Sequence, residues 1–128
     1  MKTPFLGLDH VQVAAPPGCE VVARRFYGEL LGLAEIEKPS LLAPRGGVWF
    51  ALGDRQLHIG VDAEFVPARK AHPALRLADR TALGALAGRL VEAGVDVSWA
   101  DPAELPDASR FYAHDPWGNR LELVAHVG

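Results

Sequence analysis

An internal repeat constrains the fold of this chain more than any other feature of its sequence. His10 and His72 stand 62 positions apart, and the same spacing separates Gly32 from Gly94. Each glycine follows a stretch of helical periodicity, where a residue in the left-handed conformation commonly ends a helix. Two copies of one supersecondary unit are therefore expected within the 128 residues.

The last strand of each copy supports the same alignment. Residues 54–59 can be laid over 118–123, which places His58 at the position of Glu122, 64 residues further along the chain. Short apolar or alternating runs bounded by Gly and Pro complete each copy and are typical of strands. The predicted order is therefore β-α-β-β-β, twice. The expected elements are strands near 8–14, 33–36, 48–52, 56–61, 72–77, 95–99, 110–114 and 120–125, a helix over 20–31, and a second helix between an N-capping Asp79 and Gly94.

These elements predict an α+β fold in one domain, residues 1–128. It would consist of two paired βαβββ modules, at about 5–62 and 71–127, joined by a linker at 63–70 that contains Pro67. The helices should present apolar stripes to the core. The residues of these stripes are Val22, Ala23, Phe26, Tyr27 and Leu30 in the first helix and Leu83, Leu86, Leu90 and Val91 in the second.

Strand side chains alternate between two faces, so parity sorts each strand into two sets. One set is apolar and suits packing under the helices: Val11, Val13, Leu57, Ile59, Val61, Leu75, Leu77, Leu121, Leu123 and Ala125. The other set is polar: His10, Gln12, Gln56, His58, His72, Arg76, Arg120 and Glu122. A merely solvated face would carry Lys, Glu, Thr and Ser, so the histidines and the carboxylate indicate a cleft rather than a surface.

Imidazole and carboxylate groups are the usual ligands of zinc, nickel, iron and manganese in proteins. His10, His72 and Glu122 share one face and correspond through the repeat, so they are predicted to bind a divalent metal ion. His58 is either a fourth ligand or a residue that contacts a ligand or the substrate.

Other residues of the polar set are candidates for binding a substrate. Gln12, Gln56, Arg76 and Arg120 could orient a polar or anionic molecule, although an arginine at a strand end usually reaches solvent. Trp49 is either an apolar wall of the cleft or ordinary core. His126 is expected to be exposed and inert, and His114 to stabilise a turn or line the rim of the cleft.

Composition excludes several classes of partner. The net charge is −3, with acidic and basic residues interspersed, which argues against binding to nucleic acid or an anionic membrane. No apolar run approaches the roughly 20 residues of a membrane span, and no secretory signal is visible. The single cysteine, Cys19, cannot form an internal disulfide. A cytoplasmic protein with a small-molecule partner is expected.

Three segments resemble the vicinal-oxygen-chelate superfamily, which includes glyoxalase I, the bleomycin resistance proteins and the extradiol dioxygenases. They are Leu8-Asp9-His10-Val11, His72-Pro73-Ala74-Leu75, and Asp115-Pro116-Trp117-Gly118-Asn119-Arg120-Leu121-Glu122-Leu123. The resemblance implies a curved mixed sheet around a cleft, a divalent metal held by His10, His72 and Glu122, and often a homodimer. It also suggests Glu122 as a catalytic base.

Position 58 separates members of the superfamily. Glyoxalase I-like enzymes usually carry a glutamate there, so His58 weakens a specific assignment as a lactoylglutathione lyase. Extradiol dioxygenases resemble this chain in using two histidines and one glutamate, but most are longer, two-domain chains. Fosfomycin-modifying relatives share the three ligands, but the potassium-binding loop of those proteins is not found here. Bleomycin-binding relatives lack the metal ligands.

Two functions of different classes follow. The first is a metal-dependent lyase, isomerase or dioxygenase that acts on a small oxygenated metabolite chelated to the metal. The second is a non-catalytic protein that sequesters an antibiotic or other small molecule in a dimer cleft. The ligand set favours the first function. A homodimer is expected in either case, because open sheet edges are commonly closed against a partner.

Overall fold

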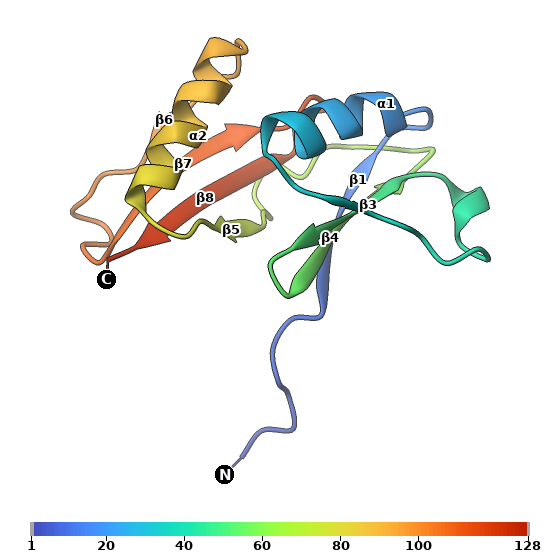
Figure 1. Ribbon diagram of the computed structural model, residues 1–128, viewed down its shortest axis with the longest axis horizontal. Coiled ribbons are helices and arrows are strands. Elements are labelled where there is room, and N and C mark those ends of the chain that lie inside the picture. The colour runs from blue at the N-terminus through green and yellow to red at the C-terminus, as the bar shows by residue number, and fades with distance from the viewer. Residues whose placement is uncertain (1, 128) are drawn as a thin grey trace. The chain divides into compact units, whose positions relative to one another are not determined.

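The structure is a computed structural model in which residues 2–127 are described. Its class is α+β, as predicted, and the chain divides into two compact units, Met1–Phe65 and Val66–Gly128. Each unit has its own four-stranded mixed sheet (Figure 1). Among the described residues, no helix has the length and apolar character needed to span a membrane.

The first unit follows the predicted β-α-β-β-β order. Its elements are β1 (His10–Ala15), α1 (Glu20–Ala23), η1 (Arg24–Leu30), β2 (Glu35–Ile36), η2 (Ala43–Arg45), β3 (Val48–Leu52) and β4 (Arg55–Val61). The strand order is β1-β4-β3-β2. β1 and β4 are parallel, and the other pairs are antiparallel.

The second unit repeats this arrangement. Its elements are β5 (Ala74–Arg76), α2 (Arg80–Glu92), β6 (Ser98–Trp99), β7 (Ala108–His114) and β8 (Arg120–His126). The strand order β5-β8-β7-β6 matches that of the first unit, again with one parallel pair, β5 and β8. The strand that was predicted to begin at His72 begins instead at Ala74, so His72 lies just before β5.

The first helix departs from the predicted periodicity in its second half. η1 is wound as a π-helix, and the Leu31 amide donates to the Phe26 carbonyl oxygen, five residues earlier, at 2.9 Å. The wider turn buries the adjacent side chains of Phe26 and Tyr27 together, while Leu30 is only half-buried. Val22, predicted to be in the apolar stripe, is 37% exposed, so that part of the prediction was wrong.

The second helix begins where the sequence predicts. The Asp79 carboxylate accepts a hydrogen bond from the Ala82 amide at 2.8 Å, which satisfies one of the free donors of the first turn. α2 packs against β8 and lies along one face of its sheet (Figure 1). Leu83, Leu86 and Leu90 are buried there, whereas Val91 is 61% exposed, against the prediction. Position 91 is next to the buried Leu90, and the turn of the helix carries it away from the sheet.

A carboxylate fixes the start of α1 to the strand layer. Glu20 Oε2 accepts a hydrogen bond from the Gly47 amide at 2.7 Å. Gly47 has φ +85°, and a Cβ atom there would lie 2.1 Å from the Ile59 carbonyl oxygen. Only glycine fits at position 47. The hydrogen bond from Gly47 lowers the pKa of Glu20 below its ordinary value.

We expect Leu86→Ala to lower the free energy of unfolding by about 2–5 kcal/mol, because it leaves a cavity at a side chain that is 3% exposed. Urea denaturation would measure the change. Val91→Ala, on the exposed side of the same helix, is the matched control and should cost less than about 0.5 kcal/mol. Similar small losses for both variants would mean that the buried face of α2 is wrongly assigned.

We expect Glu20→Gln to lower the free energy of unfolding at pH 7 by about 1–2 kcal/mol, because the Gly47 amide loses a charged acceptor. The pKa of Glu20 is lower in the folded protein than in the unfolded chain, where it is about 4.3. The charged carboxylate therefore stabilises the fold at pH values above about 4.3, and this stabilisation is lost as the pH falls toward the pKa of the folded state. The gap between variant and wild type should therefore narrow below about pH 4.3. Denaturation at several pH values tests this. A gap that is independent of pH, or one that also occurs in the exposed-residue control Glu29→Gln, would contradict it.

Candidate functional site

Most of the predicted polar residues fall into two clusters, one in each unit, together with side chains that were not predicted. The His10 cluster, in the first unit, consists of Asp9, His10, Trp49, Gln56 and His58. The Glu122 cluster, in the second unit, consists of His72, Glu104, Arg110, Tyr112, Arg120 and Glu122.

The strand register assembles the His10 cluster. β4 is flanked by β1 and β3, and His58 is paired with Gln12 on one side and Trp49 on the other. The His58 ring stacks on His10 with centroids 4.4 Å apart and on Trp49 with centroids 3.8 Å apart. Because β4 is the middle strand, the imidazole of His58 is held between the two rings. Trp49 thus packs against a histidine of the cluster.

Each histidine of the cluster uses one ring nitrogen in a hydrogen bond. His58 Nε2 donates to Gln56 Oε1 at 2.8 Å, and His10 Nδ1 donates to Asp9 Oδ1 at 2.9 Å. The latter bond also lowers the pKa of Asp9. A carboxylate on one nitrogen orients the ring and leaves the other nitrogen, Nε2 of His10, available to a metal ion. Sequence reasoning assigned no role to Asp9, although it precedes His10 directly.

Burial distinguishes the two histidines. His58 is 5% exposed, and its burial, followed by the nearby charge of His10, lowers its pKa. The ring is therefore uncharged at neutral pH. The side chain of His10 is 45% exposed. Gln12 is exposed and extends across Gly60, where a Cβ atom would lie 2.6 Å from Gln12 Cδ.

The Glu122 cluster is built on β8. Glu122 is paired with Ala74 of β5 on one side and Tyr112 of β7 on the other. His72 Nε2 lies 3.0 Å from Glu122 Oε1, and His72 Nδ1 lies 2.9 Å from the Lys70 carbonyl oxygen. Two of the predicted ligands are therefore in direct contact.

The His72–Glu122 pair suits a divalent ion. An imidazole nitrogen and a carboxylate oxygen, both common ligands of divalent ions, lie 3.0 Å apart here. Both ring nitrogens of His72 face oxygens that only accept hydrogen bonds, so each contact requires a ring proton. A cation on Nε2 would take the place of one proton.

Three residues of the cluster were missed from the sequence: Glu104, Arg110 and Tyr112. Arg110 Nη1 lies 3.7 Å from Glu122 Oε2 and donates to Tyr112 Oη at 2.8 Å, and Arg110 Nη2 lies 3.8 Å from Glu104 Oε1. Parity offered a signal: Arg110 and Tyr112 alternate with the buried Phe111 and Ala113 of β7.

The remaining candidates differ in their contacts. The Arg120 guanidinium lies over the Tyr112 ring, with Cζ 4.2 Å from the centroid. Arg76 is exposed at the end of β5. His114 and His126 are also exposed.

A buried turn places β8. Asp115 Oδ1 accepts hydrogen bonds from the amides of Trp117, at 3.0 Å, and Asn119, at 2.8 Å. Asn119 Nδ2 donates to Asp115 Oδ2 at 2.8 Å, and Asn119 Oδ1 accepts from the Ala68 amide at 3.0 Å. Gly118 has φ +95°, which favours glycine at the tight part of the turn. The Asp-Pro-Trp-Gly-Asn motif thus determines where β8 begins.

Neither cluster holds a complete ligand set by itself. The described residues contain no group of three or more His, Cys, Asp or Glu side chains that could bind a metal ion. Two donors come from each unit: imidazoles from the first, and an imidazole and a carboxylate from the second. The chemistry of these donors fits zinc, nickel, iron or manganese.

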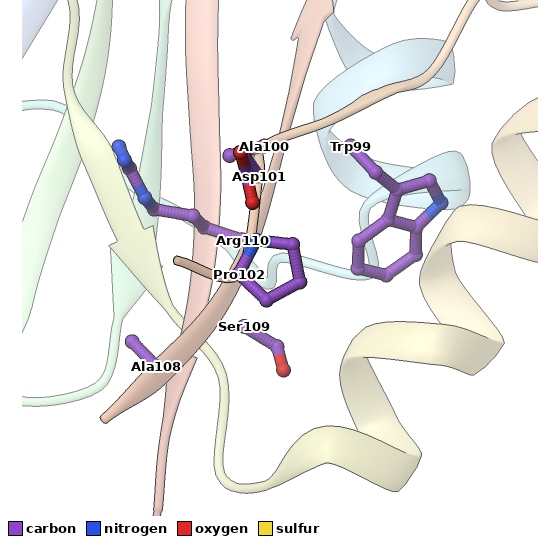
Figure 2. Close-up of a pocket in the computed structure, with 7 residues that line it drawn as sticks. All are labelled: Trp99, Ala100, Asp101, Pro102, Ala108, Ser109 and Arg110. Atoms are coloured by element: carbon purple, nitrogen blue, oxygen red, sulfur yellow. The ribbon is translucent and has the colours of Figure 1, made fainter. Parts of the chain in front are cut away.

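A small cavity lies at the edge of the second unit's sheet, apart from the predicted ligands. Its volume is about 50 Å³, and it is lined by Trp99, Asp101, Pro102, Ser109 and Arg110, among others. Figure 2 shows the Arg110 guanidinium pointing away from the Trp99 indole. Because small-molecule sites usually have volumes of roughly 300–1,000 Å³, this cavity is too small for a metabolite.

Several solved structures are similar to this chain over nearly its full length. A protein from Bacillus anthracis described as a glyoxalase family protein is 46% identical, with 98% of this chain and 99% of that chain covered and a TM-score of 0.89. A lactoylglutathione lyase from Agrobacterium tumefaciens is 19% identical, with 96% of each chain covered and a TM-score of 0.73. A mutant fosfomycin resistance protein from Listeria monocytogenes, in complex with Mn(II) and 1S,2S-dihydroxypropylphosphonic acid, is 16% identical, with 97% of this chain and 93% of that chain covered and a TM-score of 0.74.

The two distant structures show the shared fold alone. No protein-family model matches the sequence, and no curated protein matches it significantly. The assignment rests on the glyoxalase family protein, whose likeness extends over nearly the full length of both chains. This chain therefore belongs to the glyoxalase family of the vicinal-oxygen-chelate superfamily.

Proposed function

We propose that this protein is a metal-dependent enzyme that binds a small oxygenated metabolite through neighbouring oxygens on a divalent ion. The ligands would be His10, His72 and Glu122. The observation that carries the proposal is the direct contact of two side chains of the ligand type, His72 and Glu122, whose nitrogen and oxygen are 3.0 Å apart.

The hydrogen bonds of the two histidines support the same ligand set. Asp9 accepts from Nδ1 of His10, and the Lys70 carbonyl accepts from Nδ1 of His72. Each bond orients its ring and would leave Nε2 as the nitrogen that binds the ion. An oxygen partner on the second nitrogen is the usual support for a metal-binding histidine.

His58 fits better as a support for His10 than as a fourth ligand. Its ring faces are covered by His10 and Trp49, and its Nε2 donates to Gln56. A buried, uncharged imidazole can stack on a ligand without repelling the ion. We therefore assign to His58 the role of positioning the His10 ring.

The bound metal would act as a Lewis acid on the chelated oxygens of the substrate. Glu122 is the residue best placed to move a proton. Its side chain is only 12% exposed, and Arg110 Nη1 lies 3.7 Å from Oε2. An ionised Oε2 could accept a proton from a substrate carbon or hydroxyl next to the chelated oxygens.

The structural relatives bear on the reaction class through what they bind or catalyse. One is a lactoylglutathione lyase, and another was crystallised with Mn(II) and a dihydroxy phosphonic acid. Both descriptions name oxygenated small molecules, and we propose that this chain also acts on one. Iron in the purified, untagged protein would favour dioxygenase chemistry, whereas nickel or zinc would favour a lyase or isomerase.

We further propose a homodimer. β1, a six-residue strand, forms one edge of the first sheet, and β5 forms one edge of the second. Open strand edges favour pairing with another chain. Sedimentation equilibrium at micromolar concentration should give twice the mass of one 13.8 kDa chain. A single-chain mass under these conditions would contradict the dimer but not the metal site.

The metal site predicts a graded response to substitution. His10→Ala, His72→Ala and Glu122→Ala should each sharply lower the metal content, because each removes a ligand. His58→Ala should weaken zinc affinity by about 10–100-fold without abolishing binding, as loss of a supporting residue does. Elemental analysis and calorimetric titration with zinc measure both effects. Affinity should also fall below about pH 6.5, since a protonated imidazole cannot bind the ion.

The exposed His126 provides the control for this series. His126→Ala should retain full metal content, and circular dichroism should show that every variant is folded. Full metal stoichiometry in both His72→Ala and Glu122→Ala would overturn the site. A non-catalytic binding protein would then be the better description of this chain.

A further inference from the structure

We propose that the substrate carries an oxyanion group, a carboxylate or a phosphate, in addition to its chelating oxygens, and that Arg120 binds it. This inference rests on the proposed function and names the substrate class of the same site. Its starting point is the pair of arginines in the Glu122 cluster, which make very different contacts.

Arg110 is already engaged. It donates to Tyr112 Oη at 2.8 Å and lies between two carboxylates, 3.7 Å from Glu122 Oε2 and 3.8 Å from Glu104 Oε1. Its side chain is largely buried, and its charge is balanced by these neighbours. Arg110 is therefore a positioning residue for Glu122 rather than a group available to a ligand.

Arg120 is held in place but not neutralised. Its guanidinium lies 4.2 Å above the centre of the Tyr112 ring, and the residue is half-buried. Within residues 2–127, no carboxylate lies within ion-pair distance of Arg120, and its side chain makes no hydrogen bond. A guanidinium that is oriented by an aromatic face and retains its five N–H donors is suited to binding a carboxylate or phosphate with two parallel hydrogen bonds.

The position of Arg120 relates the anion to the chemistry. Arg120 and Glu122 are two residues apart on β8 and project from the same face, about 6.6 Å apart along the strand. An anion on Arg120 would thus lie beside the proposed metal ligand without competing for the ion. This spacing suits a small molecule whose charged group is a few bonds away from its chelating oxygens.

Tyr112 is not available as a stacking surface for an aromatic ligand. Arg120 covers its ring, the His72 ring contacts it edge-on with centroids 5.7 Å apart, and its hydroxyl accepts from Arg110. The ring therefore orients Arg120 between fixed neighbours. Recognition at this position is by charge and hydrogen bonding rather than by stacking.

Two probes that differ in one substituent, a charged carboxylate or a neutral carboxamide, test the inference. Both 3,4-dihydroxybenzoate and 3,4-dihydroxybenzamide present neighbouring hydroxyls to a metal and an electron-withdrawing carbonyl across the ring. Calorimetric titration into the zinc-loaded protein avoids redox chemistry, because zinc has none. We expect the benzoate to bind at least about tenfold more tightly than the benzamide. A difference of this size corresponds to one charge-assisted contact with an arginine.

Arg120→Gln should reduce this preference to less than about threefold, because the variant loses most of one charge-assisted contact. The affinity for the benzamide and the zinc content should be unchanged. Arg120→Met is a second variant that keeps an apolar stem against Tyr112 in case the glutamine variant folds poorly. Arg80→Gln, an exposed residue at the start of α2, is the matched control and should retain the full preference.

The outcomes separate the two proposals. Equal affinities of the wild type for the two probes, or a preference that survives in the folded Arg120 variants, would overturn the anion site while the metal site stands. Failure of the zinc-loaded wild type to bind either probe would count against chelation at the metal. It would therefore refute the proposed function, and the anion site with it.

Discussion

The buried Asp115–Asn119 turn is the interaction on which the second unit depends. The side chains of Asp115 and Asn119 hydrogen-bond to each other and to the backbone. The Asn119 side chain also accepts a hydrogen bond from the amide of Ala68, in the linking segment. Both side chains are buried, so an unsatisfied amide or carboxylate there would cost about 1–3 kcal/mol or more. A strand shifted by one residue would turn Glu122 to the opposite face. The turn thus sets the face on which the only carboxylate among the proposed ligands lies.

The duplicated scaffold holds different chemistry at equivalent positions. In the first unit Trp49 stands opposite His58, and in the second Tyr112 stands opposite Glu122. A flat indole lies against a flat imidazole and covers it, whereas a carboxylate has no ring to stack. Glu122 instead contacts His72 and Arg110, and the tyrosine hydroxyl holds that arginine. The same register therefore produces a covered, uncharged residue in one unit and a charged, partly accessible residue in the other.

Much of the fold could be predicted from the sequence because it depends on local patterns. The β-α-β-β-β repeat, the Asp79 cap and the polar strand faces follow from periodicity and spacing. The π-helical turn could not be predicted in this way, because it changes the periodicity from which burial was inferred. Val22 and Val91 show that a stripe drawn from spacing alone can be one residue too wide.

The candidate site was predictable in its residues but not in its contacts. Parity identifies His10, His58 and Glu122, and applied to β7 it would also have found Arg110 and Tyr112. Which ring covers His58, however, depends on the strand order β1-β4-β3, a tertiary arrangement that spacing within one strand does not contain. The orientation of Arg120 over Tyr112 depends on side-chain conformation and likewise cannot be inferred from the sequence pattern.

The contact between Trp49 and His58 also has an evolutionary consequence. An indole against an imidazole, with ring centroids 3.8 Å apart, gains from the flatness of both rings. A family member with a glutamate at position 58 has no such ring to cover, and a tryptophan at position 49 would then face a carboxylate that needs water or a cation. Residues in direct contact are energetically coupled, so the two positions are expected to vary together among homologues. Among homologues, the residue type at position 49 should therefore correlate with the residue type at position 58.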